Sequence, residues 1–211
     1  MGRNARFAKL VEVGRGRGKM GRSWVDSPGA LPRTPGYLGT DDMVELVPKC
    51  EDCAALCCVL LPFDAGDAFG FDKAALVPCS HLAGHRCRVH DRLAEAGFPG
   101  CVRFDCFGAG QRVVQGVFGG RSWRDDPGLM APMAAAFRAM RALHEAQAML
   151  MAAQDLHLSA GDEAERLRLV AALDAGRQWT EASLAAFEAG SLGLEVRRYL
   201  AGLRGRVRRR R

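Results

Sequence analysis

Residues 50–58 of the chain read CEDCAALCC, which places four cysteines in one short stretch. Thiols crowded this closely are typical of metal ligands. Apolar residues in regular runs are scarce around them, so we expect a metal cross-link, rather than burial alone, to hold this part of the chain in shape. The 211-residue chain has eight cysteines in all, and every one is a candidate ligand: Cys50, Cys53, Cys57, Cys58, Cys79, Cys87, Cys101 and Cys106.

The spacing of the cysteines favours metal loops. Cys50-x2-Cys53 is the spacing of a zinc knuckle or an iron–sulfur loop, in which one tight turn directs two thiolates to one metal. Cys87-x2-His90 would place a thiolate and an imidazole on one face of a short helix, which we expect over residues 86–96. His90 is therefore a ninth candidate ligand. Other cysteines and histidines of this segment serve as a further loop or as reserve ligands: Cys101 and Cys106, and His81 and His85.

The vicinal pair Cys57-Cys58 leaves two arrangements open. Adjacent side chains diverge, so we do not expect both to bind one mononuclear ion; either one is a structural thiol or two metal centres are present. The spacing does not pair the cysteines, and zinc and iron–sulfur both remain open as cofactors. A disulfide framework is disfavoured because no secretion signal precedes the segment and a vicinal bridge is strained. Ordinary buried thiols would be scattered along the chain rather than gathered.

Beyond Trp123 the sequence changes to a helical pattern. Asp126-Pro127 suits an N-cap followed by proline at the first helical position, and we expect a helix over residues 132–156. Within the cysteine segment, residues 113–118 alternate apolar with small or polar residues, which predicts a strand. Apolar residues at helical spacing predict three later helices, beginning near Asp162, Thr180 and Leu192.

The net charge of +6 is unevenly distributed. Residues 1–40 carry eight basic and two acidic residues, and residues 197–211 carry eight arginines and no acid. Residues 41–196 hold the other 14 basic and 22 acidic residues, a net charge of −8. An inert, solvated tail is the favoured interpretation of these arginines; the alternative is weak binding of nucleic acid by counterion release, without reading of its sequence.

These patterns predict a mainly α-helical protein. A small irregular cysteine-rich module, held by metal, would be followed by a segment of three or four helices. No apolar run is long enough to span a bilayer and no cleavage signal is evident, so we expect no membrane contact and a cytoplasmic location. Met20 and Met43 are possible starts, which leaves open whether residues 1–42 belong to the protein. The expected division is a disordered basic extension (1–41), a metal module (48–124), a helical segment (126–203) and an arginine-rich tail (204–211).

The cysteine pattern also resembles that of known proteins. The run from Cys50 to Cys58, followed by CSHLAGHRCRVH (79–90) and CVRF (101–104), is similar to the YkgJ-type zinc- or iron-chelating family. Residues 50–124 more closely resemble the N-terminal region of actinobacterial pentapeptide-repeat proteins, and the similarity continues to about residue 155. The repeats themselves are absent, so their β-helix is not expected. The resemblance implies a cysteine-rich metal module joined to helices.

The expected function is therefore binding of zinc or an iron–sulfur cluster, in a structural, regulatory or partner-binding role with an unknown protein partner. A redox or metal-handling protein that uses an iron–sulfur cluster is the alternative. A DNA-associated regulator comes third, because only the basic tail points to it. No complete catalytic constellation is present, and neither an H-E-x-x-H motif nor a deaminase signature occurs, so we do not expect an enzyme.

Overall fold

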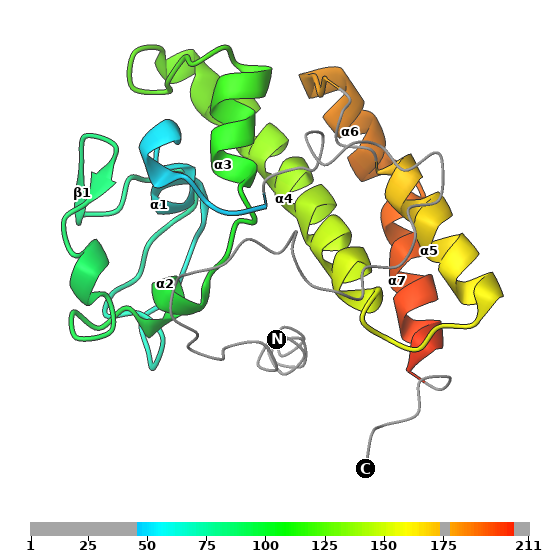
Figure 1. Ribbon diagram of the computed structural model, residues 1–211. Helices are drawn as coiled ribbons and strands as arrows, with labels where there is room; N and C mark the ends of the chain where they lie inside the picture. The colour runs from blue at the N-terminus through cyan, green and yellow to red at the C-terminus, as the bar shows by residue number, and fades with distance from the viewer. Residues whose placement is uncertain (1–45, 174–177, 205–211) are drawn as a thin grey trace, which may run out of the picture. The chain divides into compact units, whose positions relative to one another are not determined.

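A single long helix, α4 (Met130–Ala153), is the element around which the others pack (Figure 1). Its sequence is rich in Ala and Met, which are strong helix formers. The computed structural model describes residues 46–173 and 178–204. The expected N-terminal extension (1–41) and the tail beyond Arg204 lie outside these residues.

Three further helices cover one side of α4, and side chains cap the start of the first two. They are α5 (Ala160–Ala172), α6 (Glu181–Ala189) and α7 (Leu192–Leu203). Thr180 caps α6 as predicted, in a capping box with Ser183. However, α5 begins earlier than predicted, because Ser159 accepts the Asp162 backbone N–H and donates to its carboxylate at 2.8 Å.

The cysteine-rich segment consists of short elements joined by turns. A 3-10 turn, η4 (Cys50–Asp52), leads into α1 (Leu56–Leu60), and a two-residue hairpin pairs β1 (Leu82–Ala83) with β2 (Arg86–Cys87). The remaining elements are η5 (His90–Arg92), α2 (Pro99–Arg103), α3 (Ala109–Gln111), the π-helical turn η6 (Arg112–Val117) and η7 (Pro127–Leu129). The described chain is thus mainly α-helical with a small irregular region before the helices, as the sequence predicts.

One apolar core joins the cysteine segment to the helices. Residues of α1 and η6 bury their side chains in the same cluster as Phe137, Met140 and Leu143 of α4. The indole N–H of buried Trp123 donates to the carbonyl oxygen of Ala54 at 2.7 Å, which ties the end of the segment back to its start. Since α4 contacts α1, α3 and η6, the thiol-bearing loops rest on a long helix rather than on one another alone.

Two sequence-based expectations within the segment are wrong. Residues 113–118 do not form a strand but continue α3 as a π-helical turn, whose buried residues Val113, Val114 and Phe118 face the core. The alternating pattern misled because the wider turn of a π-helix also brings residues five apart to one face. Residues 86–96 do not form one helix either: Arg86 and Cys87 belong to the hairpin, which turns at Gly84 with φ of 58°.

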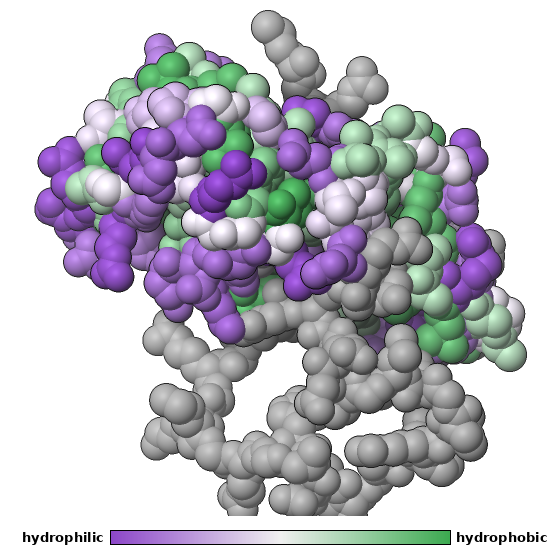
Figure 2. All heavy atoms as spheres, turned by 90° about the horizontal axis from the view of Figure 1, so that it is seen from above, coloured by the Kyte–Doolittle hydropathy of each residue, from purple (hydrophilic) through white to green (hydrophobic). Residues whose placement is uncertain are grey.

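The surface in Figure 2 is mixed, with many hydrophilic side chains over the cysteine-rich segment. Exposed large apolar side chains are few and scattered among the described residues. In the part of the chain that the structure describes, no helix has the length and apolar character required to cross a membrane.

Candidate metal centre

The Cys50-x2-Cys53 turn is fastened to the start of the helical core. The Cys53 backbone N–H donates to the Cys50 carbonyl oxygen, which closes the turn as the spacing predicts. The Gln111 side chain accepts from the Lys49 backbone N–H at 2.9 Å and donates to the Val47 carbonyl oxygen at 2.8 Å. One amide thus holds the segment that enters the turn against α3.

Cys53 and Cys106 meet at the start of α3. The Cys53 sulfur lies against the backbone of Gly110, so closely that a Cβ added there would be 2.5 Å from Sγ. Cys106 ends the loop that leads into the same helix, and its carbonyl oxygen accepts the Ala109 backbone N–H at 2.9 Å. Gly110 is therefore glycine because the Cys53 thiol occupies the space of a side chain.

The loop between Cys106 and α3 has an unusual backbone. Phe107 and Gly108 both lie in the left-handed region, with φ of 50° and 73°, and the chain reverses into α3 within these two residues. The Phe107 carbonyl oxygen accepts a 2.7 Å hydrogen bond from Nδ1 of His144, which is 2% exposed. A non-glycine residue in this region is strained, and such strain gathers at functional sites. Burial lowers the pKa of His144, so its neutral form holds the loop to α4.

Cys58, Cys79 and Cys87 are linked through the backbone. The Cys79 N–H donates to the Cys58 carbonyl oxygen at 2.9 Å, and the Cys79 carbonyl oxygen accepts the N–H of Leu82. Leu82 in turn pairs directly with Cys87 across the hairpin. Cysteines that are 29 positions apart in sequence are thereby brought into one backbone network by contacts that no local spacing encodes.

Cys101 reaches this region on α2. The helix is positioned by the Gly100 N–H, which donates to the Ala68 carbonyl oxygen at 2.9 Å, and by a cluster of stacked and edge-on rings beneath it. That cluster comprises Phe63, Phe69, Phe71, His81 and Phe98. His81 therefore packs as an aromatic ring.

The pKa values of the thiols indicate which sulfurs are neighbours. Burial raises the pKa of Cys53 to about 11, and Cys106 and Cys50 add to the rise. Burial also raises the pKa of Cys101 to about 11, with smaller contributions from Cys58, Cys79 and Cys87. The pKa of Cys87 is raised by burial and then by Cys58 and Cys79.

Cys57 and Cys58 stand at the boundary of these neighbourhoods. Their sulfurs are 3.9 Å apart, so the side chains diverge less than adjacent positions suggest. The two thiols share a hydrogen bond in which either sulfur can donate. With Cys57 as donor it lowers the pKa of Cys58, burial opposes this shift and Lys73 adds to it, and the resulting pKa is about 7. The same hydrogen bond raises the pKa of Cys57, as do its burial and the nearby Cys58, Cys53 and Cys106. Cys58 therefore loses its proton more readily than an ordinary cysteine.

Lys73 is a buried cation beside these sulfurs. It is 6% exposed, and its ammonium donates to the carbonyl oxygens of Val59, Leu61 and Ala74 at 2.9, 2.7 and 3.0 Å. Within residues 46–173 and 178–204 no carboxylate forms an ion pair with it. Burial lowers its pKa, and Cys79 and Cys58 oppose that shift.

A thiolate-bound metal suits this arrangement. A buried charge is costly unless it is paired, and a divalent ion held by four thiolates carries net negative charge. The donor set and the adjacent ammonium therefore fit such a centre. As placed, however, no three His, Cys, Asp or Glu side chains of the described residues are close enough together to hold an ion. All eight cysteines are free thiols.

The histidines do not join the thiols. The expectation that Cys87 and His90 share a helical face is wrong, because Cys87 lies in β2 and the exposed His90 begins the 3-10 turn η5. His85 instead shares a 2.9 Å hydrogen bond with the Ser122 hydroxyl. The candidate metal ligands of the described segment are therefore its cysteine sulfurs.

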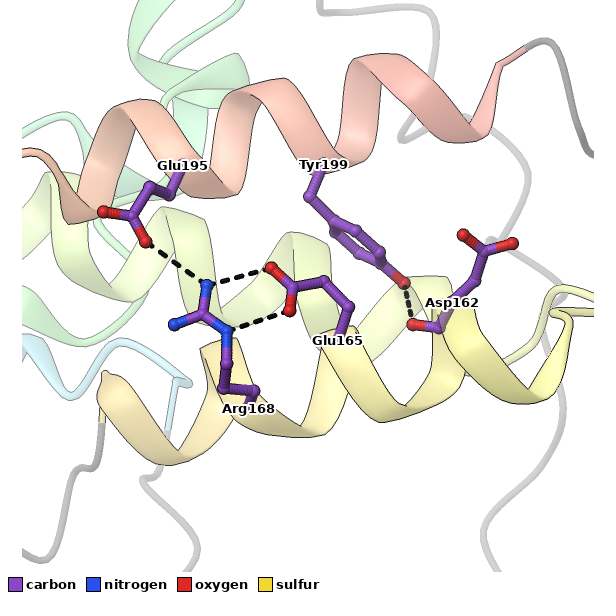
Figure 3. Close-up of polar contacts among 5 residues, drawn as sticks. All are labelled: Asp162, Glu165, Arg168, Glu195 and Tyr199. Atoms are coloured by element: carbon purple, nitrogen blue, oxygen red, sulfur yellow. Dashed lines mark hydrogen bonds and ion pairs between the residues drawn. The ribbon is translucent and has the colours of Figure 1, made fainter.

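A second polar feature, between α5 and α7, is structural. Arg168 forms ion pairs with Glu165 at 2.8 Å and Glu195 at 3.2 Å, and the Tyr199 hydroxyl donates to the Asp162 carbonyl oxygen at 3.0 Å (Figure 3). These side chains line a shallow groove. Because the charges compensate one another and are exposed, we interpret the network as a link between two helices.

Sequence reasoning missed three residues that shape the centre: Gly110, His144 and Lys73. Only Lys73 left a signal, since the chain has four lysines among thirty basic residues and this one lies between cysteines. The roles of Gly110 and His144 depend on which segment packs against α3 and α4, and no local pattern reveals that.

Comparison with known proteins gives one relative and no function. The uncharacterized protein YybG of Bacillus subtilis (strain 168) is 41% identical over 102 residues, which is 48% of this chain and 37% of that protein. The chain thus spans little more than a third of that relative's length. No family model matches, and no solved structure matches.

Proposed function

We propose that residues 50–106 form a metal-binding module that takes zinc or an iron–sulfur cluster, with zinc ahead. Its role would be structural, regulatory or partner-binding rather than catalytic. The observation that carries this is the set of eight free thiols, together with the buried ammonium of Lys73, whose hydrogen-bond acceptors among the described residues are neutral carbonyls. Metal loading would convert the thiols to thiolates and give that ammonium a counter-charge.

The short elements of this segment favour a structural role for the metal. The elements of the segment have two to six residues each, and several turns depend on single hydrogen bonds. An ion bound through thiolates would cross-link loops that have little regular structure of their own. Zinc would supply only this cross-link, since it has no redox chemistry.

A redox or metal-handling role is favoured by one observation, the exposure of Cys50. Burial raises the pKa of Cys50, and it raises that of its deeper neighbour Cys53 to about 11. An exposed ligand at the edge of a thiol group is a point at which metal or electrons can enter and leave. In that case an iron–sulfur cluster, rather than zinc, would occupy the module.

Elemental analysis with a visible spectrum tests the proposal. The full chain would be purified without oxygen from cells supplied with both iron and zinc, and its intact mass measured under native conditions. We expect one or two ions or a cluster per chain, with thiols protected from alkylation. A colourless zinc protein supports the structural role, and a brown iron protein the redox one. A metal-free protein whose eight thiols all alkylate freely would refute metal binding.

A further inference from the structure

The eight cysteines divide into two groups of four. We propose that each group binds its own metal ion: Cys50, Cys53, Cys57 and Cys106 form one site beside α3, and Cys58, Cys79, Cys87 and Cys101 form the other around the hairpin and Lys73. The inference rests on the proposed metal binding and adds to it the pairing of ligands. It also assigns the vicinal cysteines to different ions.

The first group is defined by contacts around α3. The turn of Cys50 and Cys53 is fastened to Gln111, and the Cys53 sulfur lies on Gly110. Cys106 precedes the same helix, with its carbonyl oxygen bound to the Ala109 N–H. Cys57, on α1, packs against the same apolar core as Cys53 and Cys106, and no cysteine of the second group is among the described side chains that do so. Three thiols of the first group, from the CxxC turn, α1 and the loop before α3, thus pack against one core, and Cys50 belongs to the same turn as Cys53.

The second group is defined by a backbone network. Cys58 binds Cys79 through the backbone, and Leu82 connects Cys79 to Cys87 across the hairpin. Cys101 on α2 lies next to this network: its N–H donates to the Phe98 carbonyl oxygen at 3.0 Å, and the Phe98 ring packs edge-on against His81, which lies between Cys79 and Cys87 in the chain.

The groups meet at the start of α1. The sulfurs of Cys57 and Cys58, both on α1, are 3.9 Å apart. Adjacent residues on a helix point about 100° apart, so one backbone can supply a ligand to each side. Two four-thiolate sites use all eight sulfurs and leave none spare, which matches the tetrahedral preference of zinc.

The two sites would differ in what they stabilise. The first joins the CxxC turn to α3 and, through the Phe107–His144 hydrogen bond, to α4. The second joins α1, the hairpin and α2, and it has Lys73 as its counter-charge. Loading requires the sulfurs of each group to draw together from their metal-free positions and each thiol to release its proton.

Paired substitutions test the assignment with the same number of thiols removed. One variant removes two ligands of the first group (Cys53→Ser with Cys106→Ser), and its control removes one from each group (Cys53→Ser with Cys101→Ser). Reduced full-length chains would be titrated with zinc without oxygen, in competition with a chromophoric chelator. Alkylation followed by mass spectrometry would identify the protected thiols.

We expect two tight ions in the wild type, one in the first variant and none in the control. In the first variant the four thiols of the second group should stay protected while Cys50 and Cys57 alkylate. Equal zinc contents in the two variants, or a single ion in the wild type, would overturn the pairing and leave metal binding standing. No zinc in the wild type would overturn both.

A measurement without substitutions covers the case in which a variant fails to fold. Stepwise removal of zinc from the wild type should expose the cysteines in two sets of four. The pairing is overturned if thiols of both groups become reactive together at every step. Far-ultraviolet circular dichroism would show which variants retain their helices.

Discussion

Replacing Gly110 with alanine should disable the first thiol group while leaving the second intact. The added Cβ would be 2.5 Å from the Cys53 sulfur and 3.4 Å from its Cβ. Carbon contacts are normally about 3.5–4.0 Å, so the sulfur must move by roughly 1 Å. Zinc–sulfur distances are held to about 0.2 Å around 2.3 Å, and a displacement of that size removes the ligand.

The loss in free energy of unfolding caused by Gly110→Ala can also be estimated. Overpacking a filled site lowers the free energy of unfolding by about 1–3 kcal/mol. Replacing glycine with alanine within a helix raises it by roughly 0.5–1 kcal/mol, which offsets part of that loss. The net loss should be about 1–2 kcal/mol, which for a chain of this size lowers Tm by roughly 2–8 °C. Differential scanning calorimetry of the reduced, chelated protein measures this shift, and zinc titration measures the lost ion.

Gly116→Ala is the matched control. It lies in the π-helical turn that follows α3, and its added Cβ would meet only the flexible Arg112 side chain at 3.6 Å. We expect this variant to bind two ions and to be as stable as the wild type or slightly more so. If Gly110→Ala also keeps two ions and the Tm of Gly116→Ala, then the Cys53 sulfur does not need the space beside α3, and the reasoning fails.

Three other perturbations probe the surroundings of the thiols. Lys73→Met leaves three carbonyl oxygens without their hydrogen-bond donor, so it should lower the free energy of unfolding, measured by urea denaturation, by about 3–5 kcal/mol. It should also weaken zinc binding by the second group more than zinc binding by the first. Equal weakening of both groups would contradict the placement of this counter-charge. His144 has a lowered pKa in the folded state, so its contribution to stability is complete above the unfolded pKa of 6.5 and is lost as the pH falls below that value. The metal-free wild type should therefore lose more stability than His144→Gln between pH 7 and pH 5, and parallel pH profiles would argue against a buried neutral imidazole. Trp123→Phe removes the donor to the Ala54 carbonyl oxygen and should cost about 1–3 kcal/mol by the same denaturation assay, whereas a neutral effect would mean that this link is dispensable.

Short elements show where local pattern stops being informative. The apolar pattern of residues 113–118 is compatible with a strand, and packing against α4 turns it into a π-helical turn instead. Residues 86–96 have a plausible helical sequence, but Arg86 and Cys87 gain more from pairing with Leu82 and Ala83. Elements of two to six residues gain too little from local hydrogen bonds to form independently, so long-range contacts decide them.

The sequence by itself determined the long helices and the identity of the thiols. Local signals suffice there: the Asp126 cap forms as predicted, accepting the Gly128 N–H at 3.0 Å, and the apolar residues of α4 recur at helical spacing. Tertiary structure alone decided which cysteines lie close together. Cys58 and Cys79 are 21 positions apart, and the 2.9 Å hydrogen bond between their backbones depends on how the chain returns to α1. It likewise placed Gly110 under the Cys53 sulfur and Lys73 beside Cys58, because such neighbours are set by packing between segments and not by spacing within one.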